Sequence, residues 1–384
     1  GDNAKDDSTP FYADSASKMN FTGTTKIKMT KGTFLVENAS NYQAAAATTN
    51  ADGKITNGTR YNGMENVDLE VGGKAKIVKN SVGENVEWTG AASLGEDVKT
   101  TTKVNNLTAD SSANFALYYS EGKYTINADA QLGAPNAKDS FDPVKMTREK
   151  VKINPGKKVF STTGKGLELA SSVGAASNAD SGYENNGTVD IKGGDSKKAA
   201  INVSYGHIKN NGTVNIDNGI ALYGTNGSRI ENLNNGKINV TKSGYGIVGL
   251  ATGESAQTYG LDAGASGKAV EIVNNGEINV TGDKAIGIYA DDNKGVDKDK
   301  ITITNTNKIT VNGENGVGIA LRDSKNSGSG GVINVSGTGS SDIVTKTNGI
   351  GIYAENSEIK LNSNYGIETK DGGVGIFAAK SSVP

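Results

Sequence analysis

A turn-and-strand pattern recurs through the second half of the chain and limits what the chain can fold into. One copy spans Ala269 to Asp292, where the turn Asn274-Asn275-Gly276 precedes the alternating segment Glu277-Ile278-Asn279-Val280. One copy is too short to bury its own apolar face, so successive copies must stack on one another. The repeat therefore predicts a solenoid.

Each repeat consists of two segments. The first is the turn with the alternating strand that follows it, and its glycines Gly187, Gly212 and Gly236 lie 25 and then 24 residues apart. A period in the twenties with two or three short strands is typical of a parallel β-helix, in which equivalent strands pair ~4.8 Å apart along the axis. We therefore expect an all-β parallel β-helix. Its second segment recurs at Ile220–Tyr223, Tyr245–Val248, Ile286–Tyr289, Val317–Ala320, Ile350–Tyr353 and Val374–Phe377.

Composition agrees with a solenoid. The chain has 52 Gly, only 5 Pro and 6% aromatic residues, with a mean hydropathy of −0.46. It is too polar for a large globular core and too rich in β-branched residues for simple disorder. After Pro155 no proline occurs until Pro384, as an uninterrupted ladder of β-strands requires.

The two halves of the sequence differ in regularity. Residues 1–180 predict an irregular, β-rich part of the β-helix with loop excursions, and residues 181–384 predict regular coils with inserted loops. Insertions in solenoids project as loops, where ligands are usually met. The regular part carries surplus residues around Leu250–Gly267, Asp291–Lys300, Asp323–Gly330 and Ser336–Thr347.

Alternation identifies two interior walls, because side chains of a strand point alternately to its two faces. The first wall comprises the pairs Val189/Ile191, Val214/Ile216, Ile238/Val240, Ile278/Val280, Ile309/Val311 and Ile333/Val335. The polar residue between the two members of each pair should point outward, and these residues are Asp190, Asn215, Asn239, Asn279, Thr310 and Asn334. The facing wall comprises Ile220/Leu222, Ile286/Ile288, Val317/Ile319, Ile350/Ile352 and Val374/Ile376.

Asparagines recur just before the turn. At equal phase in stacked coils, their amides could hydrogen-bond to one another in a ladder. The predicted members are Asn185, Asn210, Asn234, Asn274 and Asn305.

Several functional classes receive no support. Forty basic and 42 acidic residues, with only four arginines, argue against a nucleic-acid partner. There is no cysteine, and the single histidine, His207, has no partner suited to metal binding. No Gly-x-Ser-x-Gly motif or other nucleophile arrangement is present. We expect no catalytic residues, no metal and no cofactor.

The candidate contact residues are aromatic or acidic. Four aromatic residues share an outward phase in the second segment, and this row could contact a glycan or a protein, although packing between coils accounts for it more simply. Carboxylates crowd the insertion around Asp291, but interleaved lysines favour a solvated mixed-charge loop over a calcium site. The candidates are Tyr223, Tyr289, Tyr353, Phe377, Trp88, Tyr118, Tyr119, Tyr259, Asp291 and Asp292.

The alternation of N-N-G-x-I-N-V with G-I-G-I-Y-A, in a chain without cysteine and rich in Lys and Asn, resembles the passenger regions of large fusobacterial type Va autotransporter adhesins. The resemblance covers roughly residues 181–384. It implies a right-handed parallel β-helix at the cell surface, anchored through an outer-membrane β-barrel that lies outside this sequence. It also implies a monomeric, non-enzymatic adhesin for coaggregation with other bacteria and host-cell attachment.

Under this resemblance the partner would be a host-cell receptor, a glycan or a surface protein of another bacterium. Two alternatives stay open. The chain could be a structural stalk that spaces a distal binding head, or a β-helix enzyme that degrades polysaccharides.

Overall fold

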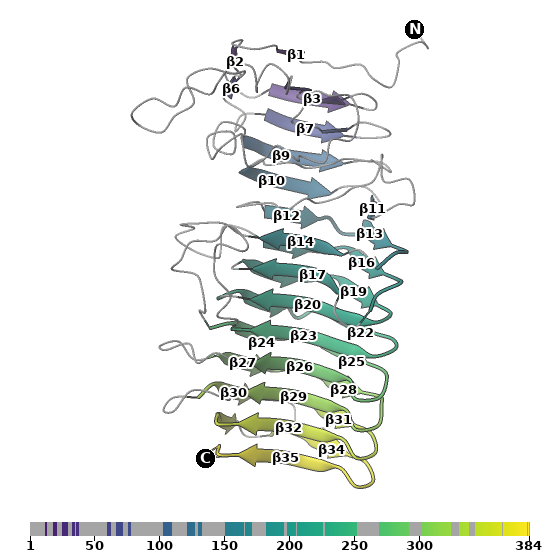
Figure 1. Ribbon diagram of the computed structural model, residues 1–384, viewed down its shortest axis with the longest axis vertical. Helices are drawn as coiled ribbons and strands as arrows, with labels where there is room; N and C mark the ends of the chain where they lie inside the picture. Colours follow the sequence, from purple (N-terminus) through teal and green to yellow (C-terminus); the bar gives the residue numbers. More distant parts are fainter. Residues whose placement is uncertain are drawn as a thin grey trace. The chain divides into compact units, whose positions relative to one another are not determined.

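Wherever the structure describes strands of successive coils, they pair in parallel, so the predicted parallel β-helix is confirmed (Figure 1). The computed structural model describes strand residues between positions 12 and 132 by their backbone alone. It further describes residues 150–164, 166–170, 182–195, 198–204, 206–225, 227–251, 269–291, 301–323, 330–337, 342–362, 364–381 and 383. Every regular element within these ranges is a β-strand.

The chain divides into two compact units, Gly1–Val159 and Phe160–Pro384. The boundary predicted at residue 180 lies outside the described residues.

In the first unit, a run of parallel strands comprises β3 (Thr25–Met29), β7 (Val67–Val71), β9 (Lys103–Ala109), β10 (Glu121–Ile126) and β12 (Lys150–Ile153). Short parallel pairs join β1 (Tyr12–Ala13) to β5 (Val36–Glu37), β2 (Lys18–Asn20) to β6 (Arg60–Asn62), and β4 (Thr33–Phe34) to β8 (Lys76–Ile77). Two further strands are β11 (Ala130–Leu132) and β13 (Lys158–Ser161).

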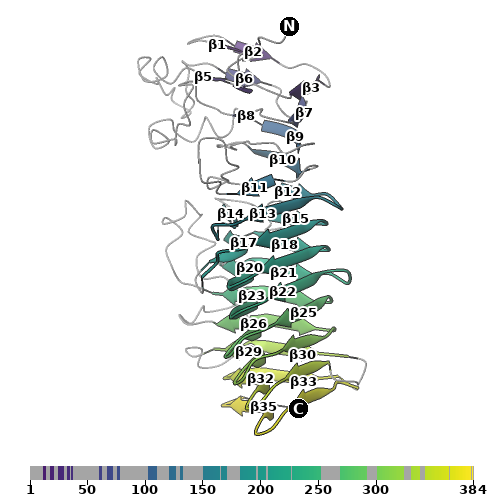
Figure 2. The same ribbon diagram turned by 90° about the vertical axis from the view of Figure 1, so that its right-hand side faces the viewer.

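Three parallel sheets form the second unit, and each regular coil contributes one strand to each sheet (Figures 1 and 2). Sheet 1 contains β15 (Gly182–Asn185), β18 (His207–Asn210), β21 (Arg229–Asn232), β24 (Glu271–Asn274), β27 (Thr302–Asn305), β30 (Val332–Val335) and β33 (Glu358–Leu361). Sheet 2 contains β16 (Thr188–Ile191), β19 (Thr213–Ile216), β22 (Lys237–Val240), β25 (Glu277–Val280), β28 (Ile309–Val311), β31 (Ile343–Thr345) and β34 (Ile367–Thr369). Sheet 3 contains β14 (Leu167–Ala170), β17 (Ala199–Ser204), β20 (Gly219–Thr225), β23 (Gly244–Leu250), β26 (Ile286–Asp291), β29 (Val317–Arg322), β32 (Ile350–Glu355) and β35 (Val374–Ala379).

Sheet 2 is the first predicted wall, with one error. The Val and Ile pairs from β16 to β28 are buried and stacked as expected. The pair Ile333/Val335 is also buried, but it lies on β30 of sheet 1, and sheet 2 continues instead with Ile343 and Thr345. The segment Val332–Val335 alternates like a strand of either sheet, so its pattern alone could not distinguish the two positions.

Sheet 3 is the facing wall, but from β26 to β32 only the second residue of each predicted pair is fully inside, and on the last strand, β35, Ile376 is half-buried. Ile288, Ile319 and Ile352 are buried, whereas Ile286, Val317 and Ile350 are half-buried and Val374 is 42% exposed. An inward glycine breaks the alternation, since a Cβ added to Gly287 would lie 2.4 Å from Ile309 Cγ2. The aliphatic residue before each such glycine therefore lies on the outer face of the sheet.

Sheet 1 supplies a third wall that was not predicted. On every strand from β18 to β33, one inward isoleucine is fully buried. Each of these strands directly precedes the turn or corner that leads into sheet 2, so its short alternation merges with that of the next strand in the sequence. The buried column is Ile208, Ile230, Ile272, Ile303, Ile333 and Ile359.

The asparagine ladder is confirmed at four of its predicted positions and wrong at one. Asn232, not Asn234, pairs with Asn210 in sheet 1, because the turn after β21 is two residues longer than the turn after β18. Asn234 is exposed. The buried amides donate in sequence along the axis, Asn185 to Asn210 (2.8 Å), Asn210 to Asn232 (2.8 Å), Asn232 to Asn274 (2.8 Å) and Asn274 to Asn305 (2.6 Å).

Replacing Asn232 by Ala should destabilise the β-helix far more than replacing Asn234 by Ala. The first change leaves the Asn210 donor and the Asn274 acceptor buried without partners, which costs about 2–5 kcal/mol for the two groups together. The exposed Asn234 should change stability by less than about 0.5 kcal/mol. Urea unfolding followed by circular dichroism measures both. Equal unfolding midpoints for the two variants would contradict a stabilising ladder.

Candidate functional site

The outer face of sheet 3 carries the predicted aromatic row. The strands of sheet 3, which we call its rungs, pair in register, so one outward residue from each rung stacks on the equivalent residue of the next along the axis. Tyrosines alternate with smaller residues until the last rung, which ends in phenylalanine. From β20 to β35 this aromatic column is Tyr223, Val248, Tyr289, Ala320, Tyr353 and Phe377.

Side chains in this column pack against their neighbours. The rings of Tyr353 and Phe377 are stacked, with centroids 5.4 Å apart and planes 3° apart. Tyr289 meets Tyr245 of the adjacent outer column at a centroid distance of 6.0 Å. Val248 and Ala320 are each only 4% exposed although they lie on the outer face. Packing between coils therefore accounts for much of this row, while the tyrosines stay half-buried and Phe377 is 45% exposed.

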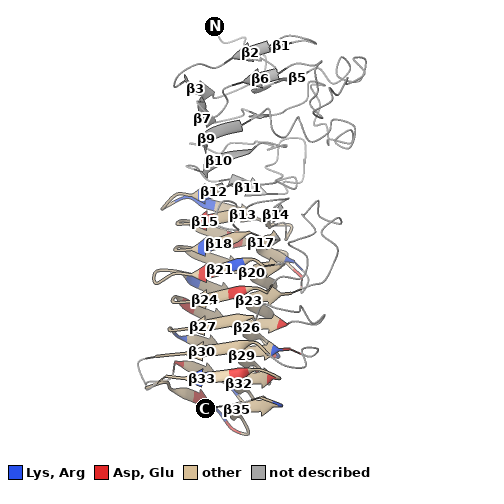
Figure 3. Cartoon of the chain, turned by 90° about the vertical axis from the view of Figure 1, so that its left-hand side faces the viewer, with Lys and Arg blue, Asp and Glu red and all other residues tan. Residues whose placement is uncertain are grey.

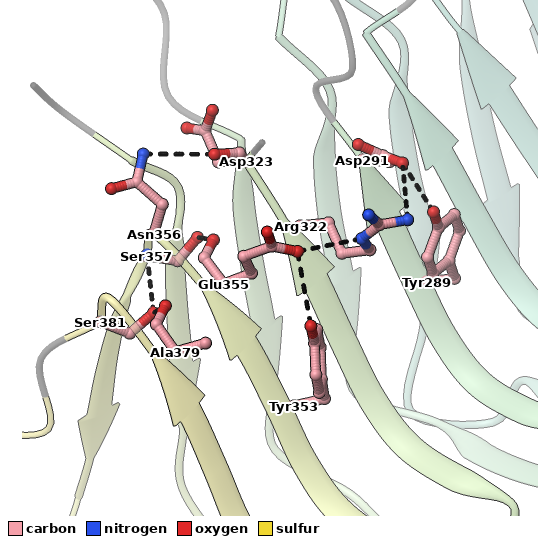
Figure 4. A network of polar contacts seen from close by, with 10 residues as sticks. All are labelled: Tyr289, Asp291, Arg322, Asp323, Tyr353, Glu355, Asn356, Ser357, Ala379 and Ser381. Carbon is pink, nitrogen blue, oxygen red and sulfur yellow. Dashed lines mark hydrogen bonds and ion pairs between the residues drawn. The ribbon is translucent and has the colours of Figure 1, made fainter. Parts of the chain in front are cut away.

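A polar network borders the aromatic column where the strands of sheet 3 end (Figure 4). Tyr289 donates its hydroxyl hydrogen to Asp291 Oδ2 at 2.7 Å, and Tyr353 donates to Glu355 Oε2 at 3.4 Å. Arg322 lies on the strand between them, with Nε 3.1 Å from Glu355 Oε2 and a terminal nitrogen 4.0 Å from Asp291 Oδ2. Two carboxylates thus flank one guanidinium in three adjacent coils.

Burial and hydrogen bonds together set the protonation states of Tyr289 and Arg322. Burial raises the pKa of the Tyr289 phenol, and the hydrogen bond to Asp291 raises it further, so the hydroxyl stays neutral and acts as a donor. The hydrogen bond to Glu355 raises the pKa of Arg322, which stays charged. Within the part of the chain that the structure describes, Asp291 Oδ1 is buried and has no hydrogen-bond partner. This oxygen is therefore a buried acceptor beside the aromatic column that no described donor satisfies.

Three of the predicted insertions connect sheet 3 to sheet 1 in successive coils. They follow Ala251, Asp291 and Asp323, close in sequence to the polar network. Asp291 is the only acidic candidate of this loop that the structure describes. Trp88, Tyr118, Tyr119, Tyr259 and Asp292 lie outside the described residues.

Sequence reasoning missed Arg322 and Glu355. Both occupy the position that Asp291 occupies in its own strand, two residues after the aromatic column. Aligning Tyr289–Asp291 with Ala320–Arg322 and Tyr353–Glu355 would have found the column of alternating charge.

A second cluster lies on the outer face of sheet 1, where acidic and basic residues alternate between neighbouring strands (Figure 3). His207 Nε2 lies 2.5 Å from Glu231 Oε2, and Arg229 bridges Glu231 and Glu271 at 2.9 Å and 2.8 Å. Burial lowers the pKa of His207 below its ordinary 6.5, although Glu231 opposes the shift. Hydrogen bonds from Arg229 and His207 lower the pKa of Glu231 even though burial acts in the opposite direction.

His207 should titrate below pH 6.5 and make the β-helix less stable in mild acid. The unfolded chain takes up this proton first, so stability is complete above pH 6.5 and falls as the pH drops towards the lowered pKa of the folded state. Because His207 is the only histidine, a single imidazole signal in NMR reports its pKa without assignment. His207→Gln should remove the loss of stability in this pH range. A folded-state midpoint above 6.5 would contradict the prediction.

Comparisons with known proteins add no relative: no family model, no curated protein and no solved structure matches the chain. Among the residues that the structure describes, no three His, Cys, Asp or Glu side chains are grouped so as to hold a metal ion. The same part of the chain contains no helix that is long and apolar enough to cross a membrane.

Proposed function

We propose that the chain is a segment of a surface-displayed autotransporter passenger and acts as a non-enzymatic adhesin through the outer face of sheet 3. The support is the difference between the three outer faces. Sheets 1 and 2 present mainly charged and amide side chains, such as Glu231 and Asn239. Sheet 3 presents two adjacent apolar columns over six rungs, a strip on the order of 24 Å long at ~4.8 Å per rung.

Apolar groups gathered on one face of a soluble solenoid usually mark a contact surface. Aromatic residues and arginine are enriched in the centre of protein interfaces. Sheet 3 offers tyrosines beside Arg322, together with an unused buried acceptor on Asp291 among the described residues. This arrangement suits a partner that brings both apolar surface and hydrogen-bond donors, which a protein receptor or a glycan would do.

The adhesin proposal predicts that binding depends on one face. Combining Tyr289→Ala with Tyr353→Ala should lower attachment of the purified chain to bacterial or host cells by on the order of tenfold or more, because aromatic anchors commonly contribute more than 1 kcal/mol each. The measurement is cell binding by flow cytometry with fluorescently labelled protein.

Matched controls lie on the other two faces of the same coils. Thr304 points outward from sheet 1 and Thr310 from sheet 2, and both are half-buried like the tyrosines. Thr304→Ala and Thr310→Ala should leave binding unchanged. Circular dichroism must show that the tyrosine variants stay folded, and Tyr289→Phe with Tyr353→Phe keeps the ring packing while removing the hydroxyls. Unchanged binding by the folded alanine variant would exclude this face.

The regular stacking of sheets 1 and 2 also suits a stalk that spaces a distal head. Deleting residues 182–381 from the full-length product separates the two functions. Adhesion that survives the deletion assigns the chain to the stalk, and adhesion lost by both the deletion and the tyrosine variant assigns it to binding.

A further inference from the structure

Four coils carry an Asn-Gly pair at the same corner, between sheet 1 and sheet 2. The pairs are Asn186-Gly187, Asn211-Gly212, Asn235-Gly236 and Asn275-Gly276. Glycine has no Cβ to shield its backbone nitrogen, so that nitrogen can approach the side-chain carbonyl of the preceding asparagine. Ring closure between these two groups is the chemistry that makes asparagine labile in proteins.

The four glycine N–H groups differ in their hydrogen bonding. Gly187 N–H donates to Asn185 Oδ1 of the buried ladder at 3.1 Å, and Gly236 N–H donates to the Leu233 carbonyl at 2.7 Å. Gly212 N–H and Gly276 N–H donate to no acceptor within the described ranges. A nitrogen held in a hydrogen bond must break it before it can attack, so two of the four sites are protected and two are not.

The asparagine side chains differ as well. Asn275 Oδ1 accepts a hydrogen bond from the Thr306 hydroxyl at 2.7 Å. Such a donor stabilises the negative charge that forms on the oxygen when the carbonyl is attacked. Asn211 has only a weaker amide donor on its oxygen, Asn235 Nδ2 at 3.3 Å, and its own Nδ2 donates to Asn186 Oδ1 at 3.3 Å. Asn275 is therefore better prepared for attack than Asn211.

We propose that Asn275, and more slowly Asn211, deamidate spontaneously in the folded protein, while Asn186 and Asn235 are protected. Gly276 N loses its proton and bonds to Asn275 Cγ, and the tetrahedral oxygen faces the Thr306 hydroxyl. The Cγ–Nδ2 bond then breaks and ammonia leaves, which closes a five-membered succinimide ring. Water opens the ring at either carbonyl and gives aspartate or isoaspartate, so the net reaction consumes one water and releases one ammonia.

Each event changes the corner chemically. A carboxylate replaces an amide, so one event takes the formal net charge of the chain from −2 to −3. Isoaspartate also adds one methylene to the backbone where the chain turns from β24 into β25. The half-buried corner thus acquires charge with age, whichever partner the outer faces bind.

Peptide mapping by mass spectrometry tests the proposal on the whole chain, aged in neutral buffer either folded or unfolded in urea. In the folded protein, Asn275 and Asn211 should react roughly threefold to tenfold faster than Asn186 and Asn235, the range expected from breaking one backbone hydrogen bond. In urea the four sites should react at similar rates, because all are Asn-Gly. The same rate at all four folded sites, or no reaction at Asn275, would overturn the proposal.

A pair of variants isolates the contribution of Thr306. Thr306→Val removes the hydroxyl beside Asn275 and should slow deamidation there by several-fold, with no change at Asn211. Thr306→Ser keeps a hydroxyl and should keep the rate. Both changes leave intact the backbone hydrogen bond from Thr306 N to the Asn274 carbonyl. If Val and Ser give equal rates at Asn275, the carbonyl is not activated by Thr306, and the preference for this site over Asn211 is wrong. Glycine variants are unsuitable, since a Cβ at Gly276 would lie 2.4 Å from the Gly236 carbonyl oxygen.

Discussion

Sheet 1 is held in register by amides buried inside the β-helix. The ladder residues Asn185, Asn210, Asn232, Asn274 and Asn305 have no exposed surface. A buried amide without a partner is costly, and a shift by one residue would turn the amides outward and place charged residues inside. The ladder ends where Asn305 donates to the Tyr365 hydroxyl at 3.0 Å, and the next two strands carry Val335 and Leu361 at this position. In this column the buried amides thus give way to the buried side chain of Val335, whereas Leu361 is 38% exposed.

With the register fixed, the coils vary only at their corners. β22 pairs directly with β25 although their starting residues, Lys237 and Glu277, lie 40 positions apart. The additional residues lie between β23 and β24, after sheet 3 has been completed. The same corner receives two more insertions in the following coils. The three longest insertions therefore lie at the edge that carries Asp291, Arg322 and Glu355. Shorter additions lengthen the corner between sheets 1 and 2, after β21 and after β30, while the paired strands of the three sheets continue past them.

The sequence alone predicted what depends on local alternation. The inward pairs of sheet 2 and four members of the amide ladder are confirmed, because each follows from the spacing to its own turn. Sheet 1 was missed because its strands adjoin those of sheet 2 in sequence, and Ile333 was consequently placed on the wrong wall. The prediction of Asn234 as a ladder member was wrong because the turn after β21 is two residues longer than the turn after β18, so the ladder asparagine lies two residues earlier, at Asn232. The pairing of Arg322 with Asp291 and Glu355 joins residues more than 30 positions apart, so it requires the register of whole coils.

The aromatic column shows how one set of side chains can serve both stability and recognition. Val248 and Ala320 are almost fully covered, so part of the surface of the neighbouring tyrosines is already buried by packing between coils. Packing fixes their rings, and the hydroxyls of Tyr289 and Tyr353 are fixed by carboxylates on their own strands. Side chains held in this way lose little conformational entropy when a partner binds, whereas long flexible side chains would lose more. Packing between coils is therefore compatible with a binding role for sheet 3, because it holds the half-exposed rings in place before a partner binds.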